Sequence, residues 1–321
     1  MSLKSHRSVN FFLFHTDEDG GATSVTHDKG GYLDLGPLDL GENARRDMVL
    51  TLEEMGIDVE SSFHEVAAGQ HELDFCPAAA LRTADQLMTA KFAIRTIAKT
   101  SWPSRNLYAK NQKPEFTDRV FIFPSPCFRR EKDVVCQTNP MNTGSARGIL
   151  LYGRTDETHQ RNRSDYQSAC KLLQTSDTGI RCTDLRGMVC KNRSPLIRIP
   201  LTGDGIMAIE LRCPDSAANP YLALAVCMAA GLDGIKQKIV PPSPVDRNIS
   251  DLTEEERNAM QITLLPGSLG EAVAELKKDD FLCQVLGQEF VNGYINAKEE
   301  EWHEYLRQVS DWETEKYLYR I

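Results

Sequence analysis

The spacing of apolar residues divides the chain into two ordered stretches separated by one without periodicity. In the first stretch, "FFLFHTDEDGG" has the pattern of an apolar strand that runs into an acidic turn, and "GENARRDMVLTLEEMG" has helical spacing that ends at Gly56. "SSFHEVAAGQHELDF" has strand-like ends around a bend, and "AAALRTADQLMTAKFAIRTIAK" has the period of a long amphipathic helix. We therefore expect strand and helix to alternate over residues 10–100.

The second ordered stretch begins after Lys191. "SPLIRIP" and "GIMAIELRC" are strand-like, and "NPYLALAVCMAAGLDGIKQKI" predicts a largely apolar helix that begins at Asn219 and Pro220. The tail from Ser268 onward has helical spacing.

Between Thr100 and Cys190 the pattern is lost. "SWPSRNLYAKNQKPEFTDRV" and "GRTDETHQRNRSDYQSACKLLQTSDTG" show neither the period of a strand nor that of a helix. A connection of this length without structure of its own is uncommon inside a compact domain, so the segment needs an explanation other than a loop.

Composition narrows the class of protein. A chain of 321 residues with 41% hydrophobic content can build a sizeable core. The beginning of the chain has no long apolar run with a cleavage site, so we expect a cytoplasmic protein. The net charge of -9 argues against a general nucleic-acid binder and suits an enzyme that gathers divalent cations with carboxylates.

The nine cysteines are odd in number and contain no CxxC pair, so neither a zinc site nor a disulfide framework is indicated. Five of them fall within residues 101–190, in the stretch without periodicity. We expect the other four to pack as small core residues, and they are Cys76, Cys213, Cys227 and Cys283.

Two carboxylates flank the predicted bend. Glu65 and Glu72 are seven residues apart in "HEVAAGQHE", so a hairpin could aim both at one cation. The alternative is two solvated acids beside a surface turn. His64, next to Glu65, either contacts a nucleotide phosphate or packs in the core.

A second candidate set follows Lys191 and consists of Arg193, Arg198, Glu210 and Arg212. A carboxylate beside guanidinium groups suits a metal and a phosphate held together, because arginine offers paired donors to phosphate oxygens. An intrasheet ladder of salt bridges fits the same residues. The glycine-rich "GGYLDLGPLDLGEN" has neither GxGxxG nor Walker spacing, so a Rossmann or P-loop site is not supported.

Several of these strings resemble the catalytic domain of type I, bacterial, glutamine synthetase: "FFLFHTDEDG", "GYLDLGPLDLGENARRDMVLTLEEMG", "HEVAAGQHELDF", "KNRSPLIRIP" and "IELRCPDSAANPYLALAVCMAAGLDGIK". The resemblance covers residues 10–99 and 191–321. It implies an α+β fold with a curved, mainly antiparallel sheet flanked by helices. Residues 1–321 are thus expected to form one catalytic-domain fragment without the family's amino-terminal β-grasp domain.

The resemblance also implies an activity, the ATP-dependent ligation of ammonia to glutamate through γ-glutamyl phosphate. Two Mg²⁺ or Mn²⁺ ions offset charge on the reacting phosphoryl group in such an enzyme. The implied partners are glutamate, ammonium, ATP and further copies of the chain, which form a dodecamer in the family. Neither a nucleic acid nor a membrane is expected.

Residue roles carry over from the resemblance at matching positions. Glu65 and Glu72 match ligands of one metal site, and Glu210 matches a ligand of the other. Arg193 and Arg198 match catalytic arginines near the transferred phosphoryl group, and His64 and Arg193 match nucleotide contacts. Arg212 matches an arginine that binds glutamate, and Tyr32 matches an aromatic residue near the ammonium site.

The aperiodic segment has a concrete interpretation. A one-base shift of the reading frame, with synonymous codons allowed, converts "SWPSRNLYAK" into the family-like string HGLHATFMPK. We therefore interpret residues 101–190 as largely an out-of-frame translation, poorly ordered, with the frame restored at Lys191 and Asn192.

Other departures affect the expected chemistry. Phe63 stands where the family usually has a histidine, Ala208 where it has an arginine, and "SVNFF" replaces a strand string, PECEF, that supplies two metal-binding glutamates. We expect this chain to be impaired or inactive. Two alternatives stay open: a ligase of the same superfamily that joins glutamate to another amine, and a non-catalytic protein that binds synthetase subunits.

Overall fold

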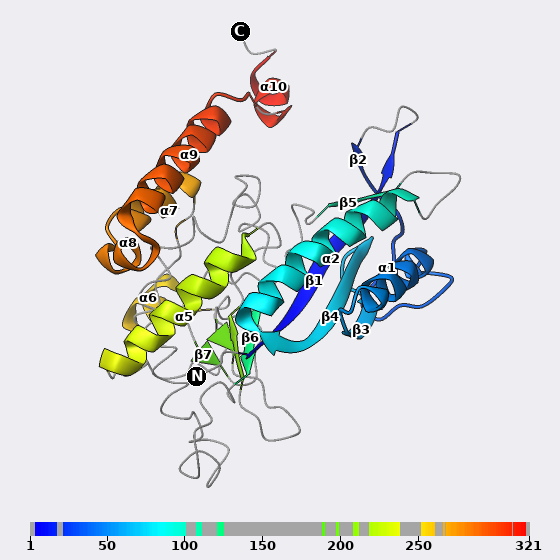
Figure 1. Cartoon of the computed structure of the whole chain (residues 1–321). Coiled ribbons are helices and arrows are strands. Elements are labelled where there is room, and N and C mark those ends of the chain that lie inside the picture. The colour runs from blue at the N-terminus through cyan, green and yellow to red at the C-terminus, as the bar shows by residue number, and fades with distance from the viewer. Residues whose placement is uncertain are drawn as a thin grey trace, which may run out of the picture.

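The computed structural model describes residues 4–17, 22–100, 107–110, 121–124, 188–189, 197–198, 208–211, 218–237, 252–260, 266, 268–309 and 311–318. Its strands are β1 (Lys4–Thr16), β2 (Ala22–Thr26), β3 (Val59–His64), β4 (Gln70–Ala79), β5 (Leu107–Lys110), β6 (Phe121–Pro124), β7 (Met188–Val189), β8 (Ile197–Arg198) and β9 (Ala208–Leu211). Its helices are α1 (Glu42–Glu54), α2 (Ala80–Thr100), α5 (Pro220–Gln237), α6 (Glu254–Ala259), α7 (Leu269–Leu276), α8 (Asp280–Leu286), α9 (Gln288–Leu306) and α10 (Asp311–Tyr317) (Figure 1).

The strands form one sheet in the order β3-β4-β1-β6-β9-β8-β7, and β2 and β5 also pair with β1. All of the pairs are antiparallel except β7 with β8. Helices flank this sheet, so the predicted α+β class with a mainly antiparallel sheet is confirmed (Figure 1).

Between Val9 and Phe14, β1 is buried on both faces, which explains its continuous apolar run. Phe11 and Leu13 point into the main core beneath the helices, whereas Phe12 and Phe14 belong to a smaller cluster with Ala67 on the opposite face. Each of these four β1 side chains is at most 3% exposed. The face that carries Phe12 and Phe14 is also the face of the candidate site described below.

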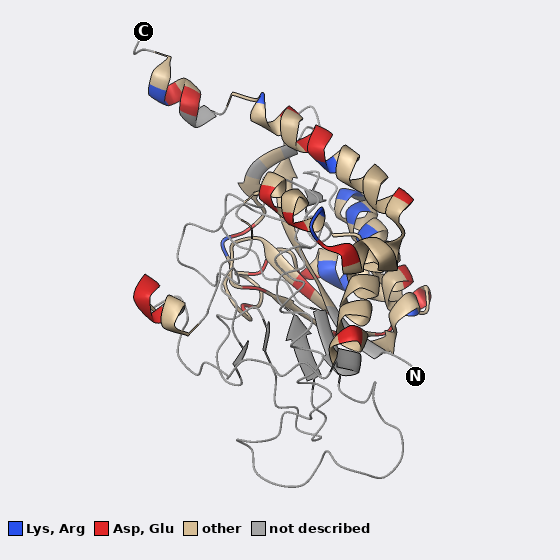
Figure 2. Cartoon of the chain, turned by 90° about the vertical axis from the view of Figure 1, so that its left-hand side faces the viewer, with Lys and Arg blue, Asp and Glu red and all other residues tan. Residues whose placement is uncertain are grey.

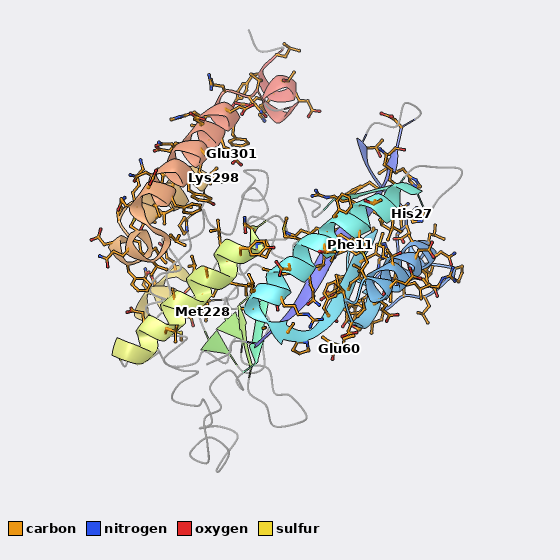
Figure 3. The ribbon with its side chains drawn as sticks, in the orientation of Figure 1. Phe11, His27, Glu60, Met228, Lys298 and Glu301 are labelled. Carbon is orange, nitrogen blue, oxygen red and sulfur yellow. The ribbon has the colours of Figure 1, made fainter. Side chains whose placement is uncertain are left out.

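α1 and α2 cover the other face of the sheet. α1 buries Ala44, Arg45, Met48 and Leu52 at helical spacing, and Gly56, with φ 77°, follows its last turn. α2 runs along β1 and β4 above the labelled Phe11 (Figure 3) and contributes mainly small and branched side chains to the core, namely Ala84, Leu87, Ala90, Ala93, Ile94 and Ala98.

The helices of the second ordered stretch extend this core. α5 lies beside α2, where the Tyr221 hydroxyl donates to Asp85 at 2.7 Å (Figure 1). α7 packs closely on α9, since a Cβ at Gly270 would lie 2.5 Å from Nε1 of Trp302. Acidic residues recur along the C-terminal helices (Figure 2). Among the described residues, no helix has the length and apolarity that crossing a bilayer requires.

Most of the predicted elements are present: the strand of "FFLFHTDEDGG" is β1, the hairpin is β3 and β4, and the predicted helices are α1, α2 and α5. The strand expected in "SPLIRIP" is described only as Ile197–Arg198. β5 and β6 lie within the aperiodic segment and carry no pattern that predicts them.

The expectation for the cysteines is partly wrong. Cys227 and Cys283 are buried, as predicted, but Cys76 is exposed. Phe75 takes the core-facing position of β4, so alternation turns the next side chain to the other side. Cys213 lies outside the described residues.

Candidate functional site

The β3–β4 hairpin brings the two candidate carboxylates to one face of the sheet. Its register pairs Phe63 with Glu72 and His64 with His71, and the Glu65 amide continues the ladder by donating to the Gln70 carbonyl at 2.8 Å. Because side chains alternate along a strand, Glu65 and Glu72 share the face of Phe63, and the two histidines lie on the opposite face.

Both glutamates are buried, with 3% of Glu65 and 8% of Glu72 exposed. The alternative of two solvated acids therefore does not describe this hairpin. The turn is held by two reciprocal bonds, from the Ala67 amide to Gln70 Oε1 at 3.2 Å and from the Gln70 amide to the Ala67 carbonyl at 2.9 Å. The Glu65 carboxylate accepts from the Val66 amide at 2.7 Å.

Asn10 completes this group from the neighbouring strand. It lies directly opposite Glu72 in the β1–β4 register and is 6% exposed. Its Oδ1 accepts a hydrogen bond from Nε2 of Gln70 at 3.2 Å. The face therefore holds two buried carboxylates next to a pair of bonded amides, a set of oxygen donors that suits Mg²⁺ or Mn²⁺.

Tyr32 lies close to the hairpin but is not enclosed by it. Its ring packs edge to face against the Phe63 ring, with the two ring centroids 6.0 Å apart, and the Tyr32 side chain is 49% exposed. The next residue, Leu33, donates its amide to the His64 carbonyl at 2.9 Å. The loop that carries Tyr32 is thus tied to the end of β3, beside the glutamates.

Glu210 and Arg198 occupy one row of the sheet. Arg198 pairs with Glu210, Glu210 with Ile122, and Ile122 with His6 of β1. His6 precedes Asn10 by four residues, which corresponds to roughly 13 Å along an extended strand. The backbone therefore places Arg198 and Glu210 away from the two hairpin glutamates. Arg193 and Arg212 lie outside the described residues.

Behind the hairpin, on the core face, lie two buried ion pairs that sequence reasoning did not identify. Nε2 of His64 is 2.9 Å from Asp28 Oδ1, and Nη1 of Arg45 is 2.6 Å from Asp39 Oδ2. All four side chains are at most 5% exposed. The same Arg45 atom lies 2.9 Å from Nδ1 of His71, which joins the two pairs into one cluster.

The contacts define the protonation of this cluster. His64 faces an acceptor at each ring nitrogen, Asp28 at 2.9 Å and the Glu65 carbonyl at 2.6 Å, so both nitrogens donate and the ring is an imidazolium. Burial alone would lower the pKa of His64, but the bonds to Asp28 and Glu65 and the Asp28 charge raise it. Burial would raise the pKa of Asp28, but the hydrogen bonds from His64 and Gly69 hold it well below its ordinary value.

The pKa of His71 is shifted in the opposite direction to that of His64. Burial and the nearby Arg45 charge hold its pKa well below the ordinary value, so the ring is neutral. Its Nδ1 faces the guanidinium of Arg45 and accepts, which leaves the proton on Nε2. Nε2 has no hydrogen-bond partner among the described residues.

Asp28, Asp39, His64 and His71 are a possible metal-binding group by donor type, since their ligand atoms lie within 4.8 Å of one another. Their hydrogen bonds favour a different interpretation. The charges of His64 and Arg45 already neutralise both aspartates, and each histidine carries a proton on the nitrogen that would face a cation. We therefore interpret the cluster as structural support behind the hairpin glutamates.

This interpretation changes the expected role of His64. The side chain is fully buried and both of its ring nitrogens are occupied inside the protein, so its ring supports β3. One signal in the sequence could have revealed the cluster: Arg45 stands three residues before Met48 and seven before Leu52, on the apolar stripe of α1. A charge on such a stripe needs a buried partner.

Comparison with known proteins identifies the family. The chain matches the profile "Glutamine synthetase, catalytic domain" over residues 1–114 and 189–317. This chain belongs to the glutamine synthetase family. It is 38% identical over 335 residues to a glutamine synthetase of Clostridium saccharobutylicum, and this match covers 96% of the chain and 69% of that relative. A glutamine synthetase of Staphylococcus aureus strain MW2 is 39% identical over 321 residues, with the same coverage.

Solved structures agree with this assignment. A structure described as "Apo GmaS without ligand" superposes with a TM-score of 0.80 at 25% identity, over 99% of this chain and 73% of that one. The cryo-electron-microscopy structure of Plasmodium falciparum glutamine synthetase superposes with a TM-score of 0.79 at 20% identity, over 98% of this chain and 75% of that one, and shows the shared fold. Glutamine synthetases are ligases that use glutamate, ammonia, ATP and divalent metal ions.

Proposed function

We propose that this member of the glutamine synthetase family binds a divalent cation at Glu65 and Glu72 but has little or no activity in the ATP-dependent ligation of ammonia to glutamate. The cation would be Mg²⁺ or Mn²⁺, which prefer oxygen ligands. The proposal extends the family assignment to a statement about this particular chain.

The observation that carries the proposal is Asn10. Asn10 lies opposite Glu72 in the β1–β4 pair. It supplies a neutral amide oxygen, and not a carboxylate, to the face of the sheet that carries Glu72. It falls in "SVNFF", which stands where the resemblance to the family implies two further glutamates. Two carboxylates can balance one divalent cation, but not a second one.

The consequence for the reaction follows from charge. In phosphoryl transfer, metal ions neutralise the charge that spreads over the phosphoryl oxygens, and most of the catalysis is positioning and electrostatic stabilisation. Glu65 and Glu72 would hold one ion, and Glu210 alone would have to supply the carboxylate for another. Arg193, Arg198 and Arg212 would bind phosphate and glutamate, and Tyr32 would lie near the ammonium. With the two glutamates of the β1 strand missing, the phosphates are not held for the reaction.

Titration of the purified chain with Mn²⁺ in a calorimeter tests the cation site. We expect about one ion per chain, and we expect Glu65→Gln and Glu72→Gln each to weaken binding by about tenfold or more, because each removes a charged ligand. Glu60→Gln is the matched control, since Glu60 is an exposed carboxylate of β3, the strand that leads to Glu65 (Figure 3). Equal affinity in all four proteins would refute the site.

The proposed frame shift at residues 101–190 has a separate test. Sequencing of the coding DNA through the codon of Lys191 would reveal single-base corrections that restore HGLHATFMPK in one open frame. If such corrections are found, the natural product retains the family's central strings. If the DNA reads as translated, the family name describes the ancestry of this segment and not its chemistry.

A further inference from the structure

We infer that Asp28 is a positioning residue for the cation site: its buried carboxylate holds the β3–β4 hairpin and the Tyr32 loop in place from the core face of the sheet. The inference rests on the proposed cation site at Glu65 and Glu72. Asp28 itself would not touch the ion, because it acts through the backbone of the hairpin and through His64.

The carboxylate of Asp28 gathers donors from three separate segments. Its Oδ1 accepts from the Gly30 amide at 3.2 Å, from the Gly69 amide at 2.8 Å and from Nε2 of His64 at 2.9 Å. Its Oδ2 accepts from the Leu40 amide at 3.2 Å. With 1% of the side chain exposed, water cannot replace these bonds.

Two of these donors flank Glu65 on the hairpin. His64 immediately precedes it, and its ring also donates to the Glu65 carbonyl at 2.6 Å. Gly69 lies in the turn that leads from Glu65 to Glu72, and its carbonyl accepts from the Leu13 amide of β1 at 2.9 Å. One carboxylate therefore fixes the turn at both ends.

The other two donors belong to the segment that carries Tyr32. Gly30 precedes Tyr32 by two residues, and Leu40 lies at its far end, before α1. The segment is also bound to β3 through the Leu33 amide and the His64 carbonyl, 2.9 Å apart. Asp28 thus ties together the aromatic and the acidic parts of the candidate site.

The space around the carboxylate leaves little freedom for rearrangement. A Cβ at Gly30 would lie 2.8 Å from Nε2 of His64, and one at Gly69 would lie 3.0 Å from the Leu13 carbonyl oxygen. Gly69 also has φ 68°, a backbone conformation that side chains disfavour. These close approaches mean that a shift of Asp28 displaces His64 and the turn together.

The variant Asp28→Asn tests the inference. Its amide nitrogen must face either the three donors at Oδ1 or the Leu40 amide, so at least one hydrogen bond is lost together with the ion pair. We expect Mn²⁺ binding by calorimetry to weaken by about tenfold or more, the usual effect of losing a group that orients metal ligands. Gly30→Ala, which pushes the His64 ring away without removing a charge, should act in the same direction.

Two controls separate positioning from loss of stability. Asp85→Asn makes the same chemical change on α2, away from the hairpin, where Asp85 accepts a hydrogen bond from the Tyr221 hydroxyl at 2.7 Å. Leu87→Ala destabilises the core at α2, away from the hairpin. Its thermal unfolding midpoint shows how much loss of stability alone affects Mn²⁺ binding, and the midpoint of Asp28→Asn is compared with it. Both controls should keep Mn²⁺ affinity within about twofold of the unmodified chain, because neither alters the turn.

The outcomes are distinct. Weakened binding in Asp28→Asn and Gly30→Ala, with unchanged affinity in both controls, supports the positioning role. Unchanged affinity in Asp28→Asn, while Glu65→Gln loses the ion, overturns the role and leaves the proposed cation site standing. No Mn²⁺ binding by the folded, unmodified chain overturns the cation site and the positioning role together.

Discussion

The buried pair of Arg45 and Asp39 makes the sharpest prediction about stability. The two side chains are 5% and 0% exposed, with Nη1 and Oδ2 2.6 Å apart. The substitution Arg45→Met keeps an unbranched chain on the apolar stripe of α1 but leaves the Asp39 carboxylate buried without its cation. Removal of one partner from such a pair costs about 3–5 kcal/mol of unfolding free energy.

A second substitution tests the cause of that loss. Asp39→Asn removes the remaining charge while its side-chain oxygen still accepts from the Gly41 amide, a bond of 3.0 Å. We therefore expect the double variant to be more stable than Arg45→Met alone by about 2 kcal/mol, although it has lost more of the native contacts.

Urea-induced unfolding followed by far-ultraviolet circular dichroism measures these differences. Arg46→Met is the matched control, because the neighbouring Arg46 is 65% exposed and its pair with Asp47 is 3.9 Å long. The control should lie within about 0.5 kcal/mol of the unmodified chain. If Arg45→Met changes stability as little as Arg46→Met, or if Asp39→Asn brings no recovery, the pair does not stabilise the fold as described.

Three further predictions concern the hairpin and the core. The pKa of His64 is raised in the folded state, so protonated His64 stabilises the fold. This contribution to the free energy of unfolding is fully present below the ordinary pKa of 6.5 and is lost as pH rises through the raised value. In the metal-free chain, the stability difference from His64→Gln should therefore shrink above pH 6.5 in urea titrations, and a constant difference would contradict the ion pair. Gly69→Ala should lower unfolding free energy by about 1–2 kcal/mol, because φ is 68° and the methyl meets the Leu13 carbonyl oxygen at 3.0 Å; an unchanged urea midpoint would contradict this. Leu52→Ala, at a fully buried position of α1, should cost about 2–5 kcal/mol in the same assay, and a loss below 1 kcal/mol would mean that α1 does not cover the core.

The spacing of apolar residues was sufficient to predict elements that depend mainly on interactions between neighbouring residues. The apolar period of α1 and α2 and the bend between β3 and β4 are properties of neighbouring residues, and the structure contains each of these elements. The register across the sheet is different in kind, because β6 pairs with β9 although 83 residues separate Pro124 from Ala208. Such a pairing depends on packing between distant segments and leaves no trace in either strand's own sequence.

The candidate site was predictable to a similar extent. Alternation along a hairpin is enough to place Glu65 and Glu72 on one face, and the register agrees with that placement. The partner of Asn10 and the donors of Asp28 were not predictable, since His64 is 36 residues from Asp28 and Gly69 is 41. A buried charge such as Arg45 signals that a partner exists, but only the fold identifies it.

Phosphate release by the purified chain tests the central proposal most directly. The chain is incubated with ATP, Mg²⁺, glutamate and ammonium, next to the glutamine synthetase of Clostridium saccharobutylicum as a positive control. We expect release at the level of a sample without glutamate, because the charge of a second metal ion is not balanced on the Asn10 face. Glutamate-dependent release that Glu65→Gln abolishes would show that this chain is a working synthetase and would contradict the proposal.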